Sequence, residues 1–156
     1  MPQTGAKAAP FTWLGVAAIV AGGALAAAIA HRPAQNLVWL VAYLVLVVGV
    51  AQYVLGAGQA ALARRALPAG VLWGEWALLN LGHLGVIGGR LAELFTAVLV
   101  GTLAYAAALA WFVLALRGGV AGTRLLLYRL FALFLLLSSL VGVALTVARH
   151  YSFLAS

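Results

Sequence analysis

The chain has 156 residues, of which 67% are hydrophobic and only 7% are charged. A water-soluble domain carries about 25% charged residues, so this composition excludes an ordinary soluble protein and indicates that lipid surrounds most of the chain. The absence of cysteine excludes disulfides, thiolate metal sites and covalently attached haem. The net charge of +7 comes from single or paired basic residues at the ends of apolar runs. This placement indicates membrane topology and gives no support for a nucleic-acid partner.

The apolar runs predict an all-α, polytopic transmembrane bundle of five helices in a single integral membrane domain, 1–156. About 20 apolar residues cross the hydrocarbon core of a bilayer. The run 71–116 is too long for one span, and Gly88, Gly89 and Arg90 predict its break, because paired glycines favour a turn and arginine is costly at mid-membrane. The first run is too long for the apolar core of a signal peptide, so we expect it to remain as a span. The predicted spans are 11–30, 37–56, 71–89, 91–116 and 125–148.

The basic residues predict the orientation of these spans. Six of them fall on the side that holds the N-terminus and three on the other side. We therefore expect a cytoplasmic N-terminus and an outside C-terminus in the plasma membrane, and the Ala/Leu/Gly/Arg bias favours a bacterial inner membrane. Segment 57–70 is then a cytoplasmic interfacial loop or short helix. The first group is Lys7, Arg64, Arg65, Arg117, Arg124 and Arg129; the second is Arg32, Arg90 and Arg149.

Small residues at helical spacing predict the packing faces, because helices in lipid are held together by close approach of their backbones. Three spans carry such stripes. The last span is bulky all round in its first half, where Tyr128, Leu130, Phe131 and Phe134 predict a lipid-facing or partner-facing surface. The stripes are Ala18, Gly22, Ala26 and Ala30 in the first span, Gly82, Gly85 and Gly89 in the third, and Ala97, Gly101, Ala104 and Ala108 in the fourth.

Polar residues concentrate in "WALLNLGHLGVIGGRLAEL", residues 76–94. On a helix, Asn80, His83 and Arg90 share one face. His83 lies below the outer end of its span, where an imidazole needs a partner. That partner is predicted to be Asn80 or a carbonyl of another helix, in which case His83 only aids packing. Arg90 and Glu93 are expected to form an ion pair that closes the turn and stabilises it little.

A ligand site is the alternative interpretation. His31 and His150 end the first and last spans on the same side of the membrane as His83. Imidazole binds haem iron, zinc and copper. His83 with His31 or His150, aided by Asn80 and Arg90, would hold a haem b; His31, His83 and His150 with Glu93 would hold a metal ion. No local metal-binding motif supports either site.

The chain has two acidic residues, Glu75 and Glu93, and Glu75 is expected in the cytoplasmic part of the third span. An acid inside a membrane is a candidate proton or cation site. The alternative is that Glu75 reaches the interface beside Trp73 and Trp76, or pairs with Arg65, Arg124 or Arg129.

The sequence contains no paired carboxylates, no nucleophile motif and no phosphate loop, so we expect no catalytic centre. The first hypothesis is a non-catalytic or accessory subunit of a larger membrane assembly, with lipids and a membrane-protein partner or a second copy around it. The alternative is a haem- or metal-binding protein for electron transfer or metal handling. A small oligomeric transporter or channel is weaker, because no span is broken near the midplane.

Overall fold

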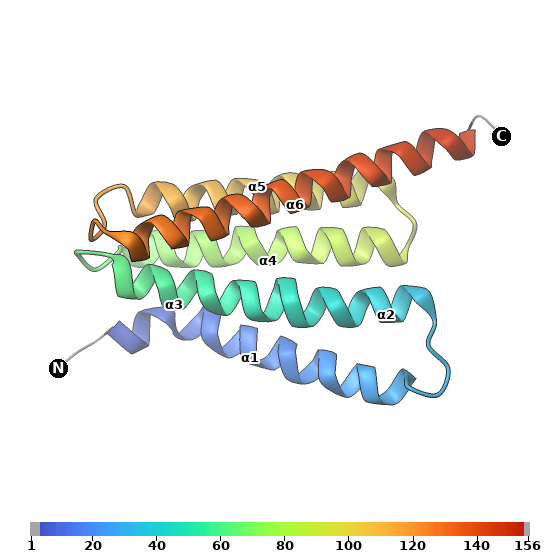
Figure 1. Ribbon diagram of the computed structural model, residues 1–156, viewed down its shortest axis with the longest axis horizontal. Helices are drawn as coiled ribbons and strands as arrows, with labels where there is room; N and C mark the ends of the chain where they lie inside the picture. The colour runs from blue at the N-terminus through green and yellow to red at the C-terminus, as the bar shows by residue number, and fades with distance from the viewer. Residues whose placement is uncertain (1–3, 155–156) are drawn as a thin grey trace. The chain divides into compact units, whose positions relative to one another are not determined.

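The computed structural model describes residues 4–154, with side chains for residues 8–148. Within these residues every regular element is helical, which confirms the all-α prediction of five helices (Figure 1). The chain divides into two compact units, Met1–Ala66 and Leu67–Ser156. The first holds α1 (Thr4–Ile29) and one continuous helix formed by α2 (Gln35–Ala42), the π-helical η1 (Tyr43–Ala51) and α3 (Gln52–Leu62); the second holds α4 (Ala69–Leu91), α5 (Phe95–Ala115) and α6 (Thr123–Leu154).

Four of the described helices are long and apolar enough to cross a membrane, namely Ala8–Ile29, Gln35–Leu62, Phe95–Ala115 and Thr123–Ala148. The chain is therefore a multi-pass membrane protein. The helix outside this group is α4, whose 23 residues give a length of about 35 Å, enough for a crossing. Glu75, Asn80 and His83 lower its hydropathy, and Glu75 and His83 are buried.

In the first unit, α1 packs along the continuous helix through glycines. A Cβ placed on Gly15 would lie 2.9 Å from the backbone oxygen of Gly49, and one on Gly22 would lie 2.6 Å from Val45 Cγ2. Gly49 belongs to η1, so the π-helical segment coincides with a close approach of two backbones. Of the predicted stripe, Ala18 and Gly22 are buried but Ala26 and Ala30 are exposed. The contact face instead runs toward the start of α1, where Phe11 covers Gly56.

In the second unit, α4 and α5 meet at backbone distance. A Cβ on Gly82 would lie 2.7 Å from the Tyr105 nitrogen, and one on Gly85 would lie 2.7 Å from the Gly101 Cα. Only a hydrogen fits in these positions. The predicted glycine stripe of the third span is thus confirmed as a packing face, and Gly101 is its counterpart on α5.

The turn between α4 and α5 does not lie at Gly88-Gly89-Arg90, so that predicted break is wrong. The helix continues to Leu91, and residues 92–94 form the turn. Gly89 is needed for packing, since a Cβ there would lie 2.6 Å from the Val98 nitrogen. The reversal uses Glu93 with φ +57°, followed by a hydrogen bond of 2.8 Å in which the Leu94 N–H donates to the Gly89 carbonyl. This is the bond pattern of a helix end that normally has glycine in the left-handed position.

The end of α3 and the exposed surface of α6 also differ from the sequence prediction. Residues 57–62 continue α3, so the connection to α4 is limited to 63–68. On α6, Leu130 and Phe134 are exposed as predicted, but Tyr128 is buried. Tyr128 therefore does not belong to the exposed surface of α6.

Candidate functional site

Two polar side chains of the second unit, those of Glu75 and His83, lie on the buried face of α4. Glu75, Leu79, Gly82 and His83 are all buried there, at spacings of four, three and one residues. This face turns toward α5, because Gly82 packs directly on the Tyr105 backbone. The glycines that bring α4 close to α5 thus also enclose the polar groups.

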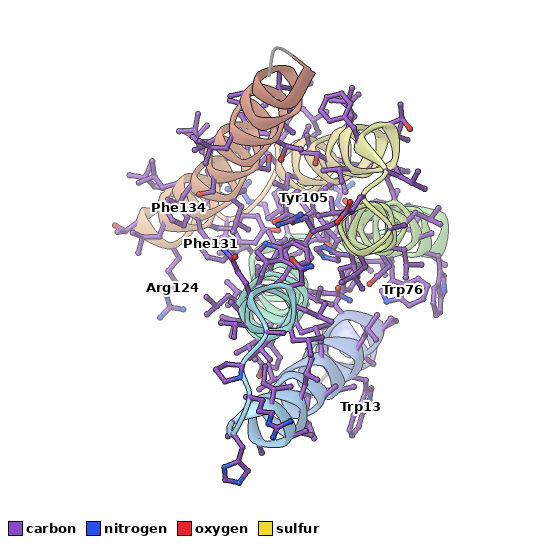
Figure 2. The ribbon with its side chains drawn as sticks, turned by 90° about the vertical axis from the view of Figure 1, so that its right-hand side faces the viewer. Trp13, Trp76, Tyr105, Arg124, Phe131 and Phe134 are labelled. Atoms are coloured by element: carbon purple, nitrogen blue, oxygen red, sulfur yellow. The ribbon has the colours of Figure 1, made fainter. Side chains whose placement is uncertain are left out.

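His83 packs against the ring of Tyr105 on α5. The two ring centroids are 5.2 Å apart with an interplanar angle of 44°. Figure 2 shows Tyr105 inside the second unit, while Arg124 and Phe134 project outward from α6. The Tyr105 hydroxyl is buried and makes no hydrogen bond within the described part of the chain. The packing interpretation of His83 expected a hydrogen bond to Asn80 or to a carbonyl of another helix, whereas the contact seen here is with the ring of Tyr105.

Asn80 forms a hydrogen bond within its own helix. Its side-chain nitrogen donates a 2.7 Å hydrogen bond to the carbonyl of Trp76, one turn earlier on α4. Thr102 on α5 makes the same kind of bond, donating to the Val98 carbonyl at 2.8 Å. Both residues satisfy their polar atoms within the helix, a common solution in an apolar setting.

The other residues of the predicted ligand site lie apart from His83. His83 is eight residues before the end of α4, about 12 Å along its axis, whereas Arg90 is in the last turn and Glu93 lies beyond it. Glu93 is therefore too far away to share an ion with His83 or to hold its second ring nitrogen. Arg90 instead sits where a cation favours the helix dipole, and the turn is closed by backbone hydrogen bonds.

The remaining two histidines do not complete a site within the described residues. His31 follows α1 in the first unit and is exposed. His150 lies in α6, and its side chain is outside the described part. Among the residues that the structure describes, no group of three His, Asp or Glu side chains is arranged to hold a metal ion. The haem and metal interpretations gain no support from this arrangement.

Glu75 is the residue whose surroundings differ most from the sequence interpretation. Its side chain has no exposed surface, so it does not reach the interface beside Trp73, which is 56% exposed. Tyr128 on α6 is also buried, with 5% of its surface exposed. The structure thus buries the carboxyl group of Glu75 instead of placing it at the interface.

Sequence reasoning did not predict Tyr105 as a contact of His83, nor the burial of Tyr128, nor the buried amides Gln52 and Gln59 of the first unit. One signal was present for Tyr128, since it is a polar-tipped residue in the leucine-rich run "LLLYRLFALFLLL". Gln52 and Gln59 are seven residues apart, so they share one face of an otherwise apolar helix.

Comparison with protein-family models, with curated proteins and with solved structures yields no match for this chain. The functional argument therefore depends on the geometry of the chain itself.

Proposed function

We propose that the protein is a non-catalytic subunit of a larger membrane assembly, and that it docks against a helix of its partner through the second half of α6. The observation that carries this proposal is an open small-residue face in the membrane. Ser138 and Gly142 are one turn apart and exposed, and a Cβ on Gly142 would meet nothing within 4 Å. Small residues on a membrane helix are typical of a contact with another helix.

The other glycines of the membrane helices give this observation its weight. Gly23, Gly70 and Gly88 are also open. Gly23 and Gly88 directly adjoin glycines that pack tightly, Gly22 and Gly89, and Gly70 lies in the first turn of α4. Gly142 has no such neighbour. Near it in the sequence, α6 also exposes large apolar side chains such as Leu140, Val141 and Leu145, so the small face adjoins an exposed apolar surface.

The proposed location is the bacterial inner membrane, with the N-terminus in the cytoplasm. The support is the distribution of basic residues, six on the side of the N-terminus and three on the other. This orientation requires α4 to cross the membrane as a fifth span.

A pair of matched variants tests the docking role. Gly142→Leu would fill the small face, whereas Ala144→Leu adds similar bulk at an exposed position about 200° around the helix. Tagged protein is extracted in a mild detergent, and its particle size is measured by native electrophoresis. We expect the wild type and Ala144→Leu to migrate as a complex and Gly142→Leu to migrate as a single chain.

Co-expression of two differently tagged copies distinguishes a second copy of this chain from a different partner, since only self-association lets one tag recover the other. The docking role is refuted if the wild type migrates as a single chain. It is also refuted if Gly142→Leu leaves the complex intact.

A further inference from the structure

The connection between α5 and α6 brings two arginines together at the ends of two membrane spans. Arg129 is six residues after the start of α6, about 9 Å along the helix axis. Its Nη2 donates a hydrogen bond of 3.4 Å to the carbonyl of Leu116, the residue that follows α5. Arg117 is the next residue along the chain and is exposed. The guanidinium of Arg129 therefore lies beside the backbone of Arg117, level with the end of α5.

The protein compensates the charge of Arg129 only in part. A guanidinium carries five N–H donors, and the hydrogen bond to Leu116 is long for its type. The Nε of Arg129 is buried and makes no hydrogen bond within the described part of the chain. A cation inside a membrane span is costly without a partner of opposite charge. Arg129 is only half-buried, and its charge is delocalised over the guanidinium, so an anion at the accessible nitrogens would compensate the whole group.

The chain has too few acidic side chains to neutralise this end of the second unit. There are only two, Glu75 and Glu93. Glu93 lies in the turn before α5, so the 21 residues of α5, about 32 Å, separate it from the connection to α6. Glu75 is completely buried. The connection and the start of α6 carry three basic residues, Arg117, Arg124 and Arg129, which a single carboxylate could not neutralise.

The position of the two arginines in the membrane indicates which anion is available to them. Both helices that meet here, Phe95–Ala115 and Thr123–Ala148, are long and apolar enough to cross the bilayer. The connection 116–122 therefore lies at the membrane surface, where lipid phosphates are abundant. Gly118, next to Arg117, leaves open space, because a Cβ there would meet nothing within 4 Å. Guanidinium and phosphate groups match in geometry and form strong, charge-assisted hydrogen bonds.

We propose that Arg117 and Arg129 bind the phosphate of one anionic phospholipid at the connection between α5 and α6. Arg129 approaches the phosphate from within the span, and Arg117 approaches it from the membrane surface. Arg124 projects outward from α6 and does not belong to the site (Figure 2). The site lies at the first half of α6, so it is independent of the docking surface around Gly142.

The binding of phosphatidylglycerol to single-arginine variants tests this site. The protein is kept in a neutral detergent, the lipid is titrated, and native mass spectrometry measures the fraction of protein with one bound lipid. Arg129→Gln should weaken binding about tenfold, because it removes a charged hydrogen-bond donor. Arg117→Gln should weaken it about fivefold. Arg124→Gln is the matched control, since it removes the same charge from the same end of the unit, and should change binding less than about twofold.

A conservative variant separates geometry from charge. Arg129→Lys retains the charge but loses the planar fork of the guanidinium, so it should bind the lipid more weakly than the wild type and more tightly than Arg129→Gln. Circular dichroism checks that each variant is folded. Arg117 is exposed in the connection, so Arg117→Gln tests the site even where a change at Arg129 disturbs the end of α5.

Four results would overturn the proposal. Equal losses in Arg124→Gln and Arg129→Gln would show a diffuse attraction to the basic end and no defined site. Unchanged lipid binding with lower stability in Arg129→Gln would show that Arg129 only caps α5, where a cation favours the helix dipole. Equally tight binding of phosphatidylcholine, which has no net charge, would remove the need for an anionic lipid. Displacement of the lipid by an excess of inorganic phosphate would make this a site for free phosphate.

Discussion

The pair α4–α5 and the helix α6 belong to the same unit but differ in how much of their surface is buried. In the most apolar stretch of α5, 39% of the residues are buried, compared with 6% in that of α6. The α4–α5 contact uses Gly82, Gly85 and Gly101, whereas α6 exposes a face of large side chains, among them Leu126, Leu130 and Phe134.

This difference shows how residue size determines helix association in lipid. Because lipid tails are as apolar as leucine, burying a leucine between helices gains little, and backbone approach at glycine gains more. The same close approach encloses His83 and Tyr105, which would be costly to expose to hydrocarbon. In this unit, the glycines and the buried polar groups are therefore two aspects of one interface.

The largest effect is expected from a bulky residue in the α4–α5 contact. Gly85→Leu places its Cβ on the Gly101 backbone and should lower the free energy of unfolding by about 3 kcal/mol. Gly88→Leu is the matched control, because a Cβ there meets nothing within 4 Å, and it should change stability by less than about 0.5 kcal/mol. Unfolding in mixed micelles, followed by circular dichroism, measures both. Equal effects of the two variants would contradict the packing account.

A smaller effect should separate a buried from an exposed phenylalanine. Phe112 on α5 has no exposed surface, and Phe134 on α6 is 65% exposed. Phe112→Ala should cost about 2 kcal/mol or more, since it leaves a cavity among packed side chains. Phe134→Ala should cost about 0.5 kcal/mol or less, because lipid fills the space. The same unfolding measurement decides this, and a larger loss at Phe134 would show that α6 is packed against protein.

The smallest effect concerns the turn that joins the two packed helices. Glu93 has a φ of +57°, a conformation that glycine adopts without a steric penalty. Glu93→Gly should therefore raise the free energy of unfolding by up to about 1 kcal/mol. Glu93→Ala, which retains a Cβ, should give no such gain. A loss of stability in both variants would mean that the Glu93 side chain contributes to the turn, and would contradict the prediction.

The sequence alone could predict the helices and the α4–α5 contact face, because both depend on local signals. Apolar length identifies a span, and the spacing of Gly82, Gly85 and Gly89 identifies a face. The turn was misplaced because paired glycines have two uses, reversal and close packing. At Gly88-Gly89, packing prevails, and the chain reverses at Glu93, a residue type that sequence rules do not favour there.

The surroundings of Glu75 could not be predicted in this way. Its burial depends on which side of α4 meets α5. The burial of Tyr128 depends on the rotation of α6, which has no small stripe in its first half to fix that rotation. For His83, the sequence suggested a hydrogen bond to Asn80 or to a carbonyl of another helix. It did not indicate the contact with the Tyr105 ring, which lies on a different helix and 22 positions away in the sequence.

Whether α4 crosses the membrane is the claim on which the candidate site most depends, and the absence of cysteine makes it directly measurable. Ala66→Cys and Ala92→Cys place one exposed thiol before and one after α4, by the same chemical change. Cells with a permeabilised outer membrane are treated with a maleimide that cannot cross the inner membrane. The account predicts labelling at position 92 and none at position 66 until the inner membrane is opened. Equal labelling of the two thiols in intact cells would show that α4 does not span the membrane, and would contradict both the five-span topology and an intramembrane Glu75.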